Sequence, residues 1–370
     1  MFKVGSWPTS DQKLLLQACL LSGLPAQEAW KKWTHRVDFD NADQVSHTLL
    51  PLVFRNPAFS GFQDPLLAKC QGIYRQTWVT NQLLWKKTLP FLTQLIEAGV
   101  DKIILLKGMA MIHRYYQDFG MRVVGDIDIL IKKEQLPLVS PLLQNSGWRA
   151  NVPRFDLHNL DHLNRWHALN LTHPKGMDLD LHWSFIQENG SQLDEAVIKD
   201  CIPMGPFYIP SPTHLLLQTC VHGVKYSPVP LIRWVVDAMT IFKRSGPEIH
   251  WEQLVELAKG ARVCLPLSSA LQLLTQEFDA PIPKEMVERL KEVPSTRLER
   301  LEYHCHLRGY RDTACWFRYC LNQGYGNVKS QLLHMHNYLT TSARLPTPWL
   351  IPFFGVYWVF KRIFRKLRAF

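Results

Sequence analysis

The spacing of apolar residues predicts helices at both ends of the chain and a sheet between them. Before residue 100 the apolar positions follow the helical period, and the longest such segment runs from about residue 73 to residue 98. Gly99 follows it, and glycine is favoured just past a helix C-terminus. From residue 213 the helical period returns and predicts helices at 213–224, 230–243, 251–258, 265–278, 284–292 and 297–308.

Between these regions the apolar positions form short runs typical of β-strands, at 102–106, 123–131, 165–172 and 177–183. The first two are almost continuously apolar, whereas the last two alternate between polar and apolar residues. The segment that joins the last two contains Pro174 and Gly176, which predicts a hairpin turn. A short helical stretch at 109–116 and a helix at 134–146 complete a strand–helix alternation.

These changes of period divide the chain into four predicted parts. With 370 residues, the chain can hold two domains or one large domain with helical additions. The parts are an N-terminal helical region (1–99), a core (100–190), a C-terminal helical domain (191–345) and a basic amphipathic tail (346–370). Because the predicted strands are few and short, we expect an α+β fold with a small mixed sheet and helices on one side.

Composition is that of a soluble globular protein. Hydrophobic residues make up 46% of the chain, and no apolar run reaches the length of about 18 residues that a transmembrane helix needs. The N-terminus lacks the pattern of a signal peptide. The 8 cysteines are scattered without a Cys-x-x-Cys pair, as in reduced cytoplasmic proteins. A cytoplasmic location is therefore predicted.

The formal net charge of +10 is concentrated in the tail. Half of it comes from five basic residues near the C-terminus, Lys361, Arg362, Arg365, Lys366 and Arg368. The rest of the chain, at about +5, is not unusually basic, so the charge gives no strong nucleic-acid signal. Within residues 349–370, apolar positions face away from these basic ones. That pattern is typical of a helix lying on an anionic membrane surface, or of a terminal helix docked on the core.

Two aspartates in the second apolar run are the strongest chemical feature. Asp126 and Asp128 are separated by one residue, so on a strand they share a face, roughly 6–7 Å apart along the chain. Ile127 and Ile129 then face the core. A cation between the carboxylates would remove their repulsion, and oxygen ligands favour Mg²⁺ or Mn²⁺ over zinc. The alternative is an edge strand that exposes two ordinary carboxylates to solvent.

A metal site needs a further ligand from a neighbouring strand. Asp180 is the candidate, because it lies on the alternating run 177–183, and Asp178 is the alternative. Asp180 could also accept the proton of an attacking hydroxyl. His182 shares its face and is interpreted as structural.

Other polar residues are given weaker roles. Lys107 and Gly108 end the first strand and could bring a positive charge and a close backbone approach to phosphates. In the predicted trailing helices, residues His222, Arg233 and Asp237 either line an acceptor cleft or tie those helices to the sheet. Zinc is disfavoured at His158 and His162, because no cysteine or glutamate constellation lies nearby. The group His304, Cys305 and His306 with Cys315 and Cys320 is a similarly weak signal.

The order of these motifs resembles a known family. The sequences LLKG, RVVGDIDILI and DLDLHW are similar to those of the uncharacterised bacterial branch of the nucleotidyltransferase superfamily related to DNA polymerase β, over roughly residues 75–245. The resemblance implies that Asp126 and Asp128 bind metal and that Asp180 is the third carboxylate. Gly108 corresponds to the glycine of a Gly-Ser loop whose serine is replaced here by Met109.

The resemblance also implies a reaction. It is the transfer of a nucleoside monophosphate from an NTP to an unknown acceptor, with Mg²⁺ or Mn²⁺ as cofactor and a suggested link to cell-surface polysaccharides. Lys107 would take over the serine's phosphate contact, and Arg122 would contact a phosphate or support the metal-binding strand. An alternative is a catalytically inert fold that acts as a scaffold or as a membrane-associated interaction protein, located peripherally at the inner membrane face.

Overall fold

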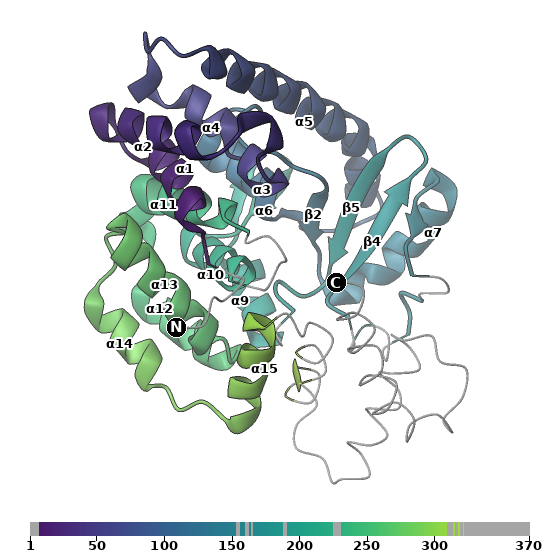
Figure 1. Ribbon diagram of the computed structural model, residues 1–370. Helices are drawn as coiled ribbons and strands as arrows, with labels where there is room; N and C mark the ends of the chain where they lie inside the picture. Colours follow the sequence, from purple (N-terminus) through teal and green to yellow (C-terminus); the bar gives the residue numbers. More distant parts are fainter. Residues whose placement is uncertain are drawn as a thin grey trace, which may run out of the picture. The chain divides into compact units, whose positions relative to one another are not determined.

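The computed structural model (Figure 1) describes residues 7–152, 156–159, 163, 166–187, 191–224, 231–308, 314, 317–318 and 321. These residues belong to two compact units. The larger holds the described residues up to Thr296 together with 306–308, and the smaller begins at Arg297. The candidate site lies wholly in the larger unit.

A mixed sheet forms the centre of the larger unit. In its described residues the sheet has seven strands in the order β3-β4-β5-β2-β1-β7-β6. The central strand β2 runs parallel to β5 and antiparallel to β1, while β1 runs parallel to β7. The strand bounds are β1 Ile104–Leu105, β2 Ile127–Leu130, β3 Arg149–Ala150, β4 Ala168–His173, β5 Met177–His182, β6 Ile202–Met204 and β7 Phe207–Ile209.

The predicted α+β class with a mixed sheet is confirmed, and all four predicted strands are present. Strands β1 and β2 are shorter than predicted, and three strands were missed. The missed strands β3, β6 and β7 have two or three residues each, too few to show a period of two. The predicted hairpin joins β4 to β5, and its turn is closed by a 2.9 Å bond from Gly176 N to His173 O.

The N-terminal region is helical, as predicted. Thr9 caps the first helix in a reciprocal arrangement with Gln12. Asp64 begins the long helix α5, where its carboxylate accepts from Leu66 N at 2.8 Å and from Trp30 Nε1 at 2.7 Å. The helix bounds are α1 Ser10–Leu20, α2 Gly23–Arg36, α3 Gln44–His47, α4 Leu50–Arg55 and α5 Pro65–Glu97, with short 3₁₀ turns at Phe39–Asn41 and Pro57–Phe59.

Helices also follow the first two strands, and after β7 the regular structure of the described residues is helical. The predicted trailing helices are confirmed to within a few residues, and the bounds of α14 match. The bounds are α6 Lys107–Ala110, a π-helical turn Met111–Tyr116, 3₁₀ turns Lys133–Gln135 and Gly246–Glu248, α7 Leu136–Ser146, α9 Ser191–Asp200, α10 Pro212–Gly223, α11 Arg233–Ser245, α12 Trp251–Gly260, α13 Cys264–Phe278, α14 Lys284–Glu292 and α15 Arg297–Leu307.

Two helices that matter for the site, α10 and α11, pack closely against one another. The contact depends on Gly223, because a Cβ atom there would lie 2.1 Å from the Trp234 ring. Any larger residue would therefore push α11 away from α10.

Some sequence-based predictions concern parts of the chain outside the described residues. The amphipathic tail, the membrane contact of residues 349–370, and the residues His162, Cys315 and Cys320 all fall there. No helix among the described residues has the length and apolar character needed to cross a membrane. The domain bounds derived from the sequence stay a prediction.

Candidate active site

The pairing of β2 with β5 brings Asp128 and Asp180 together. The two residues are register partners in neighbouring parallel strands, so their side chains leave the same face of the sheet. His182 lies two residues further along β5 on that face, and its Nε2 is 3.0 Å from Asp128 Oδ1. Ligand atoms of Asp128, Asp180 and His182 all lie within 4.8 Å of one another. The structure thus gathers two carboxylates and an imidazole at one point.

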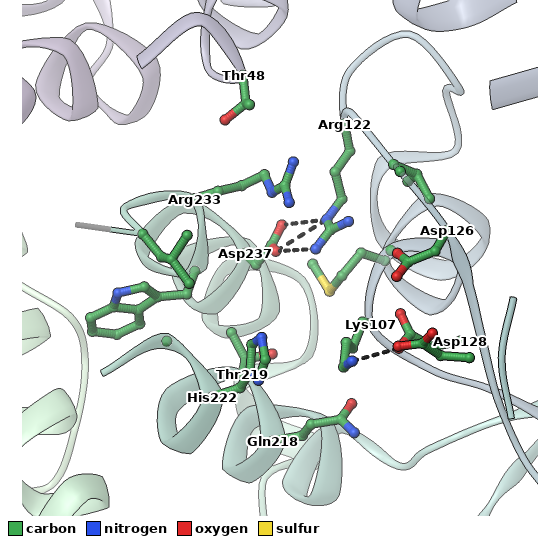
Figure 2. Close-up of a pocket in the computed structure, with 18 of the residues that line it drawn as sticks. Thr48, Lys107, Arg122, Asp126, Asp128, Gln218, Thr219, His222, Arg233 and Asp237 are labelled. Carbon is green, nitrogen blue, oxygen red and sulfur yellow. Dashed lines mark hydrogen bonds and ion pairs between the residues drawn. The ribbon is translucent and has the colours of Figure 1, made fainter. Parts of the chain in front are cut away.

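Asp126 lies beside this group rather than on the strand. Strand β2 begins at Ile127, because the segment before it is bound by a side chain from α5 instead of by a neighbouring strand. Asn81 donates to Phe119 O and Arg122 O, each at 2.7 Å. Even so, the carboxylates of Asp126 and Asp128 face the same space in Figure 2.

Lys107 neutralises the buried carboxylate. Its Nζ lies 2.5 Å from Asp128 Oδ1, an atom that also contacts His182. Lys107 has a φ of +41°, in the left-handed region that side chains with a Cβ seldom adopt. The turn after β1 therefore carries some backbone strain while it points a positive charge at the site.

Gly108 is required by close packing. A Cβ atom there would lie 2.7 Å from Arg122 Nη1 and 2.8 Å from Val124 Cγ2. The next residue, Met109, is fully buried, so the position of the absent serine belongs to the core. The backbone at Gly108 still lines the cavity described below.

The three carboxylates differ in how easily they ionise. Burial, followed by the charges of Asp128 and Asp180, raises the pKa of Asp126 to about 6. Burial and the Asp128 charge likewise raise the pKa of Asp180. For Asp128, burial opposes ionisation, but the Lys107 charge and the His182 hydrogen bond outweigh it and hold the pKa below its ordinary range. Asp128 is therefore the permanently charged member.

Arg122 is held in a second buried ion pair, with Asp237 of α11. Arg122 Nη2 donates to Asp237 Oδ2 at 2.9 Å, and Nε lies 3.1 Å from the same oxygen. Tyr116 OH also donates to Asp237, to Oδ1 at 2.8 Å. This pair fixes α11 to the segment that leads into β2. It agrees with one of the two roles that the sequence suggested for Asp237, that of tying its helix to the sheet.

A cavity of about 370 Å³ opens above the carboxylates. We call the side formed by Asp126, Asp128 and Asp180 the carboxylate wall. The opposite side, formed by α10 and α11, is the helix wall (Figure 2), and its polar residues are Gln218, Thr219, His222, Arg233 and Asp237. Val45 and Thr48 of the N-terminal region also line the cavity. A volume of this size is typical of small-ligand sites.

Sequence reasoning missed some of these neighbours. Asn170 on β4 is the register partner of Asp180 and donates to its Oδ1. Pairing the alternating runs residue by residue would have found it. His182 was placed on the right face but interpreted as structural, whereas its ring contacts a carboxylate of the candidate metal site. No sequence signal pointed to Gln218 or Thr48.

The donor set fits a divalent cation. Carboxylate oxygens suit Mg²⁺ and Mn²⁺, whereas an imidazole nitrogen is a donor more typical of zinc, iron, nickel or copper. Asp128, Asp180 and His182 form the group, and Asp126 lies close enough for its pKa to respond to the two other aspartates. A mixed sheet that presents acidic residues from adjacent parallel strands, beside a Lys-Gly turn, agrees with the nucleotidyltransferase class that the sequence motifs resemble.

Comparison with known proteins agrees with this class. Residues 44–279 match the family described as uncharacterised nucleotidyltransferases, and the chain belongs to that family. The resemblance found in the sequence is thereby confirmed. No protein among the curated ones matches the chain.

Two solved structures are similar to the chain, both from Helicobacter pylori. One is the protein JHP933, with 11% identity and a TM-score of 0.27, where the match covers 61% of this chain and 94% of JHP933. The other was solved as a candidate nucleotidyltransferase, with 11% identity, a TM-score of 0.27, and coverage of 60% of this chain and 96% of that one.

Proposed function

We propose that the protein is a Mg²⁺- or Mn²⁺-dependent enzyme that transfers a nucleoside monophosphate from an NTP to an acceptor and releases pyrophosphate. The observation that carries the proposal is the register of Asp128 with Asp180 on adjacent parallel strands, with Asp126 beside them. Three acidic groups that converge on one cavity suit a reaction in which metal-bound phosphates are attacked by a hydroxyl.

Asp126, Asp128 and Asp180 would hold the cation. A divalent ion bound there neutralises phosphate charge and lowers the pKa of an attacking hydroxyl. Asp180 is the member suited to accept the hydroxyl's proton, because it is half-buried and burial together with the Asp128 charge raises its pKa. His182 orients Asp128 through the 3.0 Å contact.

Lys107 and Gly108 would serve the nucleotide. In the structure Lys107 occupies the charge-balancing position beside Asp128 that a cation would also favour. Once a cation takes over that role, Lys107 is free to donate to a phosphate oxygen. Gly108 allows the backbone after β1 to approach the phosphates. A direct phosphate contact by Arg122 stays a prediction, and its ion pair with Asp237 favours support of the β2 segment instead.

The acceptor would enter along the helix wall. Gln218, Thr219 and His222 line the cavity there and offer hydrogen-bonding groups suited to a polyhydroxylated molecule. The resemblance directs the search towards sugar intermediates of cell-surface polysaccharides. A cytoplasmic protein with peripheral membrane contact through residues 349–370 would be well placed to act on them.

The test is release of pyrophosphate from ATP, CTP, GTP or UTP as Mg²⁺ is titrated, with a small-molecule cell extract added to supply the acceptor hydroxyl that takes the nucleoside monophosphate. We expect activity with the wild type, and none with Asp126→Ala plus Asp128→Ala. Asp178→Asn is the matched control, because Asp178 lies on the same strand as Asp180 but is exposed. Equal nucleotide binding and turnover in the wild type and the double variant would reject the proposal.

A second candidate function is that of an inert scaffold. Two observations favour it: the serine position is a buried methionine, and Asp128 already has a lysine partner. This function predicts no turnover with any NTP. If the scaffold acts at membranes, full-length protein should sediment with anionic vesicles more than a chain that ends at Arg344. An unchanged bound fraction would remove the membrane role.

A further inference from the structure

Two arginines meet at the cavity, and they differ in how their charge is balanced. Arg122 is buried and forms a two-point ion pair with Asp237. Arg233, the first residue of α11, lies next to it in Figure 2, where the dashed contacts of Asp237 go to Arg122 alone. Among the described residues, no carboxylate lies within ion-pair distance of Arg233.

Most of the hydrogen-bonding capacity of Arg233 is unused. Its Nη1 donates to Val123 O at 2.6 Å, and this is the only hydrogen bond of its side chain among the described residues. Arginine carries its N–H donors in a rigid fork suited to phosphate oxygens. The remaining donors of Arg233 are therefore available on a residue that lines the cavity.

A half-buried cation without a carboxylate partner is costly, and here a second cation is close by. Burial and the charge of Arg122 both lower the pKa of Arg233, to about 10, so the side chain nevertheless stays protonated at neutral pH. The pairs Lys107–Asp128 and Arg122–Asp237 are balanced internally. An anion bound in the cavity would remove the remaining imbalance at Arg233.

The charges left over on the two walls identify the anion. Asp126 and Asp180 leave negative charge on the carboxylate wall, where a cation would bind, and Arg233 leaves positive charge on the helix wall. A ligand that satisfies both needs a metal-bound phosphate at one end and a further phosphate at the other. A polyphosphate chain offers two such phosphates, whereas inorganic phosphate offers one.

We propose that Arg233 binds the β- and γ-phosphates of the donor nucleotide and is the phosphate-binding cation of the helix wall. This inference rests on the proposed function, since it takes the nucleotide as the source of the polyphosphate. It assigns the residue a role beyond tying α11 to the sheet, because the hydrogen bond to Val123 O uses only part of the guanidinium.

The experiment measures binding of inorganic tripolyphosphate, pyrophosphate and phosphate to the full-length protein by calorimetry, with Mg²⁺ and separately with EDTA. We expect Arg233→Gln to weaken tripolyphosphate binding about tenfold or more, as for loss of a charge-assisted hydrogen bond. Arg233→Lys should recover part of the affinity. Arg289→Gln is the matched control, because Arg289 is a surface arginine of α14 paired with Glu252.

Several results would overturn the inference. Unchanged tripolyphosphate affinity in Arg233→Gln is one, and an equal loss of affinity for single phosphate is another, since that indicates an acceptor phosphate site. If Arg233→Gln fails to fold, the wild type alone decides. In EDTA, tripolyphosphate should raise the melting temperature of the wild-type protein more than phosphate does at equal ionic strength. If the two anions raise the melting temperature equally, the proposal is rejected.

Failure of this inference can be told apart from failure of the proposed function. Normal pyrophosphate release with an unchanged KM for NTP in Arg233→Gln would reject the arginine's role and leave the enzyme assignment intact. Conversely, polyphosphate binding in EDTA that depends on Arg233, without any turnover in Mg²⁺, would reject the enzyme assignment and leave the anion site.

Discussion

The carboxylate wall and the helix wall face one cavity, but they are built in different ways. The carboxylate wall comes from strands β2 and β5, whose register alone places Asp128 beside Asp180. The helix wall depends on contacts between residues far apart in the sequence, such as Arg122 with Asp237. An ion pair involves one residue of each wall, Lys107–Asp128 at the carboxylate wall and Arg122–Asp237 at the helix wall, and outside these pairs charge of opposite sign is left on the two walls.

This difference separates chemistry from support. At the carboxylate wall, a bound cation could replace the Lys107 ammonium beside Asp128, because Lys107 is partly exposed and its backbone is strained. At the helix wall, both side chains of the Arg122–Asp237 pair are buried, and the pair holds α11 in place. Substitutions in the first wall should therefore change activity, and substitutions in the second should first change stability.

The largest effect is expected from Asp128→Asn. The change removes the permanently charged ligand but retains the shape of the side chain, so the rate of pyrophosphate release should fall by about a thousandfold or more. Circular dichroism should show that the variant remains folded. Asp178→Asn, treated in parallel, should retain near wild-type activity. A loss below tenfold for Asp128→Asn would mean that the carboxylate wall is not the reacting centre.

Asp237→Ala should act on stability. It leaves the Arg122 guanidinium buried without its carboxylate, which is expected to cost about 3 kcal/mol in the free energy of unfolding. Urea denaturation provides the measurement. Replacing both partners, as in Arg122→Met with Asp237→Leu, should cost less than the single change, since no charge is then stranded. A double variant that is less stable than Asp237→Ala would contradict this account.

The same contrast explains what the sequence could predict. Alternation along the predicted hairpin gave the face of Asp180 and left Asp178 as the alternative, whereas the register of Asp180 with Asp128 came from the structure. The trailing helices were found because their apolar period is long and regular. By contrast, the pair of Arg122 and Asp237 joins residues 115 positions apart, and no local pattern specifies it.

Three further features could not be read from the sequence for physical reasons. The predicted strand at 123–131 was too long: β2 begins at Ile127, and before it side chains bind the backbone, Asn81 at Val124 N and Arg233 at Val123 O. The pairing of Lys107 with Asp128 depends on how the turn after β1 folds back. The contact of His182 with Asp128 came from the structure, since the alternating pattern gave only the face on which His182 lies.

Gly108→Ala should affect both walls through steric clashes. The new methyl group would meet Arg122, which cannot move freely because Asp237 holds it, and Val124 of the segment before β2. We expect a destabilisation of about 2 kcal/mol, measured by urea denaturation, together with weaker Mg²⁺ binding. Gly125→Ala is the control, because a Cβ atom at that position meets nothing within 4 Å. Equal stability of the two variants would argue against close packing at Gly108.

The smallest effect concerns the pH dependence of stability without metal. The pKa of Asp126 is raised to about 6 in the folded protein, above its ordinary value of 3.8, so the folded state binds the proton more tightly than the unfolded state. Stability from this group is therefore full below pH 4 and is lost as the pH rises to 6. Because the side chain is partly exposed, the loss should be roughly 1–2 kcal/mol.

Urea denaturation in EDTA between pH 4.5 and 7 measures this dependence, and Asp126→Asn isolates it, because asparagine does not titrate. The difference in free energy of unfolding between the asparagine variant and the wild type should grow as the pH rises through 6. Adding Mg²⁺ at pH 7 should then stabilise the wild type more than the variant, since the cation needs the ionised carboxylate. Parallel pH profiles of the wild type and the variant in EDTA would show that the other charges of the carboxylate wall do not raise the pKa of Asp126.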